Sequence, residues 1–488
     1  MLFNELAFLI FFPLVAALHY AIPHRHRWLL LLVASYIFYM WWRVEYAALI
    51  IISTCIDYFA AIRMGSLPQK SRKRKYLLLS LASNLGLLFT FKYFNFFNDS
   101  VNHLFNWFGN PLTIPDLDIL LPVGISFYTF QTLSYTIEIY RGKIEPERHF
   151  GRFALYVSFF PQLVAGPIER AKNLLPQIDR EKRLDYGNFA EGSFLILWGM
   201  FKKIVIADRL AVGVESIYSN PEAFPGPVLV LATVLFAWQI YYDFSGYSDI
   251  AVGAARILGY KLMYNFHSPY FAKSIGEFWS RWHISLSSWF RDYLYLPLGG
   301  NRVKKGRWLA NIMIVFVVSG LWHGANWTFM AWGALHGFYY LVQSAWSSAA
   351  GGIKKTWLFS RLPVMYDTFC LFVTFAAVNL AWIFFRASSL DDAKTIILNL
   401  GVGWENVLHA PQLRDCIISL GMGYANLTVA VTSIALITVN EWLYGKADLE
   451  KGVRNYPAYV RWTLYVVLAL AILHLGIMKK EPFIYFAF

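Results

Sequence analysis

The chain has 488 residues, of which 57% are hydrophobic and only 15% are charged, whereas roughly a quarter of the residues in a soluble globular protein carry charge. This composition excludes a soluble globular protein and indicates a polytopic membrane protein. A net charge of +13 would suggest a nucleic-acid partner in a soluble chain, but loop topology accounts for it in a membrane protein, so we expect no nucleic acid.

Membrane-spanning helices are predicted along most of the chain. A hydrocarbon core of about 30 Å needs about 20 mostly apolar helical residues to cross it. The apolar runs predict an all-α fold with about eleven spans, some short or broken. The approximate runs are residues 5–22, 28–42, 46–62, 76–97, 119–139, 151–168, 226–242, 308–322, 326–343, 366–385, 424–441 and 460–478. The segment 190–210 is doubtful as a span.

The charges of the loops predict the orientation. Basic loops at 24–27, 70–75 and 141–148 alternate with the acidic stretch 98–118, which has no Lys or Arg. Because basic loops remain on the cytoplasmic side, we expect the N-terminus to face outward. The first apolar run lacks a basic n-region and a cleavage site, so we expect a retained helix rather than a removed signal.

The middle of the chain, residues 241–307, combines aromatic, polar and glycine residues and predicts a funnel or a re-entrant region. Ser274 and Glu277 have the spacing of a capping box, from which we expect one amphipathic helix with His283 on its apolar face. Glu277 and Arg281 are spaced for an ion pair. Taken alone, His283 is better explained as a residue packed in an interfacial helix, and the second buried histidine that follows, His323, favours a functional role. Asp243 and Asp249 could line a polar cavity or hold arginines, and we favour the structural role.

His323 is the strongest candidate for a functional residue. It is an ionisable group within residues 308–353, which contain no Asp, Glu, Lys or Arg, and an ionisable residue in a membrane span usually marks a functional site. A buried neutral imidazole can accept a proton near neutral pH, which suits the activation of a hydroxyl for acyl transfer. Gly320 and Gly324 would permit a broken helix or a close approach of substrate, and Asn326 could orient the ring or a substrate carbonyl. The alternative is a histidine that caps a helix end.

Other chemistries have no local signal. The sequence contains no Gly-rich phosphate loop, no G-x-S-x-G motif and no histidine pair with metal-binding spacing. Cys55, Cys370 and Cys416 are scattered and predict neither a disulfide framework nor a metal site. We read His336 as a core histidine and Arg386 as an interfacial anchor.

Several segments resemble the membrane-bound O-acyltransferase (MBOAT) family, in particular its bacterial branch of alginate O-acetylation proteins. They are EFWSRWHISLSSWFRDYLYLPLGGNR from Glu277, SGLWHGAN from Ser319, YYDFSGYSDIA from Tyr241, VAGPIER from Val164, LLVASYIFYMWWRVEY from Leu31 and LPVGISFYTF from Leu121. The resemblance is strongest over residues 1–390 and weaker over 391–488, where further transmembrane helices are expected. It implies one membrane-embedded domain over 1–488.

The resemblance also implies an architecture and a site. The fold would be a ring of about eleven transmembrane helices, with re-entrant or interfacial helices, around a central tunnel. In that family the histidine of the WHG motif is the proposed catalytic residue, here His323, and the histidine of RWHIS, here His283, is the second functional one. Supporting residues are expected within the same motifs: Asn326, Trp322, Asp243, Arg281 and Ser285.

The activity implied by the resemblance is O-acyl transfer at the bacterial inner membrane. A cytoplasmic thioester such as acetyl-CoA would donate the acetyl group as a substrate, with no bound cofactor or metal. The acceptor would be an exopolysaccharide such as alginate, reached through a periplasmic SGNH-type acetyltransferase and other polysaccharide pathway proteins. Cellulose, peptidoglycan or teichoic acid are alternative acceptors, and an acyl-group transporter or a scaffold is the alternative outside the enzymes.

Overall fold

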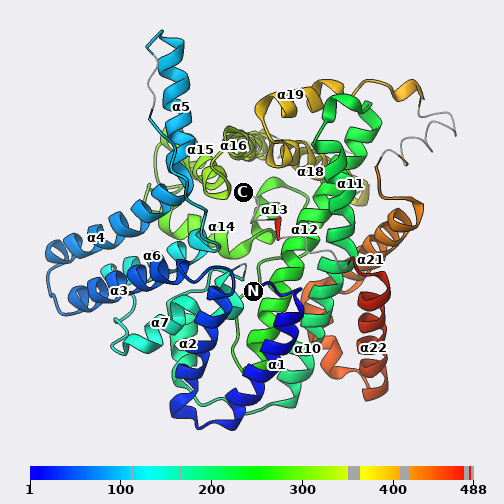
Figure 1. Ribbon diagram of the computed structural model, residues 1–488. Helices are drawn as coiled ribbons and strands as arrows, with labels where there is room; N and C mark the ends of the chain where they lie inside the picture. Colours follow the sequence, from blue (N-terminus) through cyan, green and yellow to red (C-terminus); the bar gives the residue numbers. More distant parts are fainter. Residues whose placement is uncertain are drawn as a thin grey trace. The chain divides into compact units, whose positions relative to one another are not determined.

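The computed structural model describes residues 1–110, 114–164, 166–349, 363–406, 418, 420–477 and 483–484. Cys416, one of the three scattered cysteines, lies outside them. These residues form helices joined by turns and loops, with no strand among them, as expected for an all-α chain (Figure 1). They divide into two compact units. Unit 1 comprises 1–196 and 248–263, and unit 2 comprises 197–247 and 264–488.

Unit 1 contains the N-terminal helices. They are α1 (Leu6–Ala21), α2 (His24–Met40), α3 (Tyr46–Gly65), α4 (Lys70–Leu88), the π-helical segment η1 (Phe89–Tyr93), α5 (Phe94–Trp107), α6 (Ile125–Tyr140), α7 (Phe150–Ser158), α8 (Phe160–Leu163), α9 (Ala171–Asp179) and most of α10 (Tyr186–Met200). Figure 1 shows α5 at a marked angle to α4 beyond η1, as expected where a π-helical segment interrupts an α-helix.

The prediction of one helix over 151–168 is wrong. Helix α7 ends at Ser158, the chain turns at Phe159 (φ −51°, ψ 107°), and the short α8 follows. Both helices are almost wholly buried, and the side chain of Ser35 accepts a hydrogen bond from the backbone N–H of Phe160. The apolar run therefore reflects burial in the protein rather than one membrane crossing.

Polar side chains join α3, α4 and α6 inside unit 1. The Asp57 carboxylate accepts hydrogen bonds from the Ser80 hydroxyl at 2.6 Å and from the Asn84 amide at 2.9 Å. Ser80 also donates to Thr136 on α6 at 3.0 Å. These groups are buried, and polar contacts of this kind hold helices together where no hydrophobic effect separates protein from lipid.

Unit 2 contains the C-terminal helices and the turns between them. They are η2 (Phe201–Ala207), α11 (Asp208–Tyr218), η3 (Pro221–Ala223), most of α12 (Gly226–Ile257), η4 (Pro269–Phe271), α13 (Ile275–Arg281), α14 (Ile284–Phe290), η5 (Arg291–Tyr295), α15 (Lys305–His323), α16 (Trp327–Ala349), α18 (Pro363–Arg386), α19 (Leu390–Asn399), η7 (Trp404–Asn406), α21 (Tyr424–Asn455) and α22 (Ala458–Leu475).

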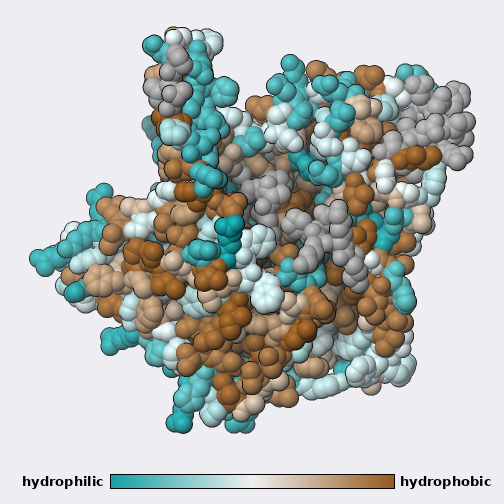
Figure 2. Space-filling model, in the orientation of Figure 1, coloured by the Kyte–Doolittle hydropathy of each residue, from teal (hydrophilic) through white to brown (hydrophobic). Residues whose placement is uncertain are grey.

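Six helical stretches within the described residues are long and apolar enough to cross a bilayer. They are Tyr46–Gly65, Lys70–Trp107, Gly226–Ile257, Val364–Arg386, Tyr424–Leu443 and Ala458–Leu475. Helix α1 is apolar but shorter. Apolar side chains also gather on the surface over α1 and α2 (Figure 2), where Leu6, Ile10 and Val33 are exposed. The chain is therefore polytopic, while the count of eleven spans and the ring around a tunnel stay predictions.

Candidate functional site

His323 is the last residue of α15, where the helix meets α16. The backbone N–H of Gly324 still bonds to the Gly320 carbonyl, and Gly324 is then extended with φ −157°. A Cβ on Gly320 would lie 2.2 Å from the carbonyl oxygen of Phe329 on α16. Gly320 therefore allows the two helices to pack closely and does not break α15, which continues to the histidine.

His283 lies in a break of the chain, not within a helix. Helix α13 ends at Arg281, α14 begins at Ile284, and His283 between them has φ 42° and ψ 54°. The prediction of one continuous amphipathic helix is therefore wrong. Left-handed backbone is uncommon for residues other than glycine, although histidine is among those that adopt it more often. Such a conformation persists only where its surroundings enforce it.

Two backbone hydrogen bonds enforce the break. The N–H of His267 donates to the Arg281 carbonyl at 2.9 Å, and the N–H of Ile284 donates to the Asn265 carbonyl at 2.9 Å. The Ser285 hydroxyl donates to the Asn265 side-chain carbonyl at 2.6 Å. The segment around Asn265 thus holds the chain on both sides of His283, which local sequence spacing does not reveal.

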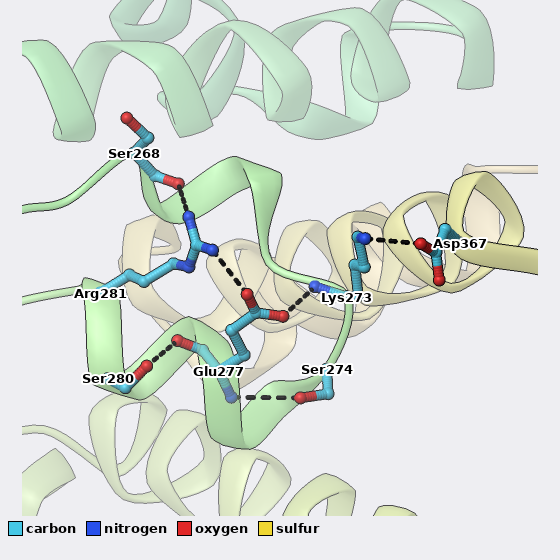
Figure 3. A network of polar contacts seen from close by, with 7 residues as sticks. All are labelled: Ser268, Lys273, Ser274, Glu277, Ser280, Arg281 and Asp367. Atoms are coloured by element: carbon cyan, nitrogen blue, oxygen red, sulfur yellow. Dashed lines mark hydrogen bonds and ion pairs between the residues drawn. The ribbon is translucent and has the colours of Figure 1, made fainter. Parts of the chain in front are cut away.

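Side-chain contacts fix α13 before the break (Figure 3). The Ser274 hydroxyl accepts from the Glu277 N–H at 3.1 Å, and Glu277 pairs with Arg281 at 2.6 Å, so the predicted cap and ion pair are confirmed. Glu277 also accepts from the Lys273 N–H, and Lys273 pairs with Asp367 at 2.6 Å. Arg281 is therefore a structural part of the turn that carries His283.

The two histidines lie close together in unit 2. Their ring centroids are 6.3 Å apart, and the residues are 0% (His283) and 2% (His323) exposed. Trp322 contacts both rings, with centroids 5.9 Å from His283 and 5.0 Å from His323. Their juxtaposition in an aromatic environment makes this the candidate active site.

Further aromatic rings surround the pair. Trp332 and Phe385 have centroids 5.0 Å and 5.4 Å from that of His323, and both meet it edge to face. Phe244 meets His283 in the same way at 4.7 Å. These rings restrict each imidazole to few orientations and keep bulk water from it, which strengthens electrostatic interactions at the site.

Burial also sets the protonation state of His283, which lies outside the six candidate spans. It lowers the pKa of the imidazole to about 3, because the charged form loses its hydration. His283 is therefore neutral at physiological pH. A neutral imidazole can accept a hydrogen bond at one nitrogen and donate one at the other.

Asp243 belongs to a buried charged group beside this pair. Its carboxylate lies 2.8 Å from the Lys203 ammonium, which also lies 2.8 Å from the Asp208 carboxylate. The other Asp243 oxygen accepts from the Ile484 N–H at 2.8 Å. Lys203 was not predicted as part of the site, because it lies in the segment 190–210, whose status as a span was doubtful. The two adjacent lysines, Lys202 and Lys203, within an apolar run were the signal that could have indicated a buried ion pair.

The remaining predicted residues take structural positions. The Asn326 carbonyl accepts from the Thr328 N–H at 3.0 Å and so caps α16, while its amide donates to the Ser388 carbonyl at 3.2 Å. His336 is buried and accepts from the Trp279 indole at 3.3 Å. The rings of Phe244, Trp332 and Phe385 were not predicted, because only the tertiary fold brings them to the histidines.

Comparison with known proteins identifies the family. The MBOAT, membrane-bound O-acyltransferase family, profile matches residues 147–361. A probable alginate O-acetylase AlgI from Azotobacter vinelandii is 36% identical over 524 residues, with all of both chains covered. The chain belongs to the membrane-bound O-acyltransferase family. It is therefore a multi-pass membrane protein and an O-acyltransferase.

Relatives within this O-acyltransferase family carry different acceptor names. A peptidoglycan O-acetyltransferase from Helicobacter pylori is 33% identical, covering 100% of this chain and 98% of the relative. A teichoic acid D-alanyltransferase from Streptococcus thermophilus is 29% identical, covering 54% of this chain and 68% of the relative. The names differ in the acceptor, which is alginate, peptidoglycan or teichoic acid, and in the transferred group, which is acetyl or D-alanyl.

Proposed function

We propose that this O-acyltransferase moves an acetyl group from a cytoplasmic thioester, acetyl-CoA, across the bacterial inner membrane for O-acetylation of an exopolysaccharide, alginate. The observation that carries the proposal is the buried His283–His323 pair, with ring centroids 6.3 Å apart. Support for alginate comes from the full-length similarity to a probable alginate O-acetylase. Acetyl-CoA enters as a substrate, and the reaction needs no bound cofactor or metal.

His323 acts as the general base. An acceptor hydroxyl gives its proton to the imidazole while its oxygen attacks the thioester carbonyl, so that a C–O bond forms and the C–S bond breaks. The imidazolium then gives the proton to the departing thiolate, which leaves as CoA. The reaction produces an ester and a thiol, and the histidine returns to its neutral form.

His283 orients the donor or the acceptor beside this base. The centroid of its neutral imidazole lies 6.3 Å from that of His323, close enough for one substrate to contact both rings. The other supporting residues act on geometry. Ser285 and Arg281 hold the turn at His283, and Asn326 holds the start of α16. Asp243 is the chain neighbour of Phe244, whose ring meets that of His283.

The acetyl group reaches the polymer through a periplasmic partner of the SGNH acetyltransferase type, together with other polysaccharide pathway proteins. This arrangement requires the basic loops on the cytoplasmic side and the N-terminus in the periplasm, as the charge distribution favours. The hydroxyl that meets His323 then belongs either to the partner or to the sugar. Membrane lipid surrounds the apolar helices.

The acceptor can be tested with acetyl-labelled CoA and membranes from cells that make the full chain, supplied separately with alginate machinery and with peptidoglycan. Label in alginate supports the proposal. Label in peptidoglycan alone would favour the second candidate, which the full-length similarity to a peptidoglycan O-acetyltransferase supports. His323→Ala membranes provide the blank in each case.

A further inference from the structure

Phe483 and Ile484 are buried in unit 2, next to α12. Phe483 is 0% exposed, and its ring stacks on Tyr247 with a centroid distance of 4.6 Å. It also contacts Phe244 at 5.5 Å. These two residues are far from α12 in sequence, so specific contacts must hold them there.

Asp243 provides a polar contact at this position. Its Oδ2 accepts from the Ile484 N–H at 2.8 Å, while its Oδ1 lies 2.8 Å from the Lys203 ammonium. A buried carboxylate is costly unless it is paired and hydrogen-bonded, and Asp243 has both kinds of contact. A hydrogen bond to an ionised acceptor is stronger than one between neutral groups.

Leu475 and Ile477, at the end of α22, bind to the helical segments next to Lys203. The Ile477 N–H donates to the Ile204 carbonyl at 3.2 Å, and the Arg209 guanidinium donates to the Leu475 carbonyl. Ile204 and Lys203 both belong to the π-helical segment η2, and π-helical bulges often occur at functional sites. Leu475 is thus bonded to Arg209 on α11, Ile477 to η2, and Ile484 to Asp243 on α12.

The contacts lead from this segment to the active site. Phe483 contacts Phe244, and Phe244 meets the His283 ring at 4.7 Å and 81°. Phe244 is therefore held between a candidate catalytic histidine and Phe483. A displacement of Phe483 would free the ring that orients His283.

We propose that Phe483 and Ile484 form a second layer of side chains behind Phe244, the ring that meets His283. Asp243, paired with Lys203, is the positioning residue that anchors this layer. Asp208 pairs with the same lysine, whereas the hydrogen bond to the Ile484 N–H comes from Asp243. Loss of the anchor lowers the rate of acetyl transfer with little change in the KM for the donor. The inference uses the proposed acetyl transfer as its rate measurement.

Asp243→Asn and Asp208→Asn provide a matched comparison, because each removes one buried carboxylate charge from Lys203 with an isosteric change. We expect kcat to fall roughly ten- to a hundred-fold in Asp243→Asn, as for a small misplacement of a reacting group, and within about two-fold of wild type in Asp208→Asn. Equal losses in both variants would contradict the anchor and indicate a purely structural charge cluster.

A second measurement does not depend on acetyl transfer. Ile484→Cys, in a chain whose three native cysteines are replaced by serine, is labelled with a maleimide in membranes. We expect slow labelling with Asp243 intact or Asp208→Asn, and at least ten-fold faster labelling with Asp243→Asn. Unchanged labelling would overturn the anchor whether or not the acetyl donor is correct.

Phe483→Ala tests the ring layer without changing a charge, in case Asp243→Asn does not fold. We expect the same loss of kcat, with partial recovery in Phe483→Leu because leucine refills part of the space. Wild-type kcat in Phe483→Ala would contradict the role of the layer.

Discussion

The imidazole ring centroids of His283 and His323 lie 6.3 Å apart, although the two residues belong to different kinds of local structure. His323 ends a regular helix, whereas His283 occupies a left-handed break between two short helices. The pair therefore depends on the packing of α15 and on the turn around Asn265. Changes in either should alter the site in different ways.

Substitutions at His283 should separate its backbone role from its imidazole. Left-handed backbone costs roughly 1–2 kcal/mol for most L-residues, but glycine adopts it freely and asparagine more readily than alanine. We expect His283→Asn and His283→Gly to melt at higher temperatures than His283→Ala in detergent, while all three lose acetyl transfer. A lower melting temperature for His283→Gly than for His283→Ala would contradict the assigned backbone strain.

The stability of the protein should depend on pH through His283. Its pKa is about 3 when folded and about 6.5 in an unfolded chain, so below pH 6.5 the unfolded chain binds a proton that the folded chain does not. Stability is then lost as the pH falls from 6.5 towards 3, by at most about 1.4 kcal/mol per pH unit. His283→Asn should show a smaller drop in melting temperature between pH 7 and pH 5. Equal drops would contradict burial of a neutral imidazole.

Gly320 should be needed for the packing of α15 on α16. Alanine there would place a methyl group 2.2 Å from the Phe329 carbonyl oxygen, and overpacking typically costs about 1–3 kcal/mol. Gly306 lies on the same helix with nothing within 4 Å of an added Cβ. We expect Gly320→Ala to lower the melting temperature and Gly306→Ala to leave it nearly unchanged. Equal effects would refute the close approach.

The hydrogen bond between Ser285 and Asn265 should couple the two residues. A double-mutant cycle with Ser285→Ala and Asn265→Ala is expected to give a coupling of about 0.5–1.5 kcal/mol, measured by unfolding. Ser280→Ala is the control, because that exposed serine bonds to the Glu277 carbonyl within its own helix, α13. Additive effects of the Ser285 and Asn265 changes would show that the bond does not hold the turn.

Local features of the sequence were predicted well. The Ser274 cap and the Glu277–Arg281 pair depend on residues within one turn of a helix, and the membrane class follows from composition. The break at His283 could not be predicted, because the Asn265 segment enforces it through tertiary contacts. Periodicity instead favoured one continuous helix.

The charged and aromatic residues around the site could not be predicted for the same reason, because tertiary contacts bring them together. Lys203 and Asp243 are distant in sequence, and only the packing of η2 on α12 makes them an ion pair. The run 151–168 is apolar and forms α7 and α8, which are buried in protein. Hydropathy alone does not distinguish a buried apolar segment from a membrane span.

The role of His323 as general base is the central claim. Acetyl transfer from labelled acetyl-CoA, measured in membranes containing equal amounts of inserted protein, tests it most directly. We expect His323→Gln to lower the rate about 10²- to 10⁴-fold, the usual contribution of a general base, while His336→Gln, a buried histidine on α16 bonded to Trp279, retains most of it. Wild-type transfer by His323→Gln would contradict the claim.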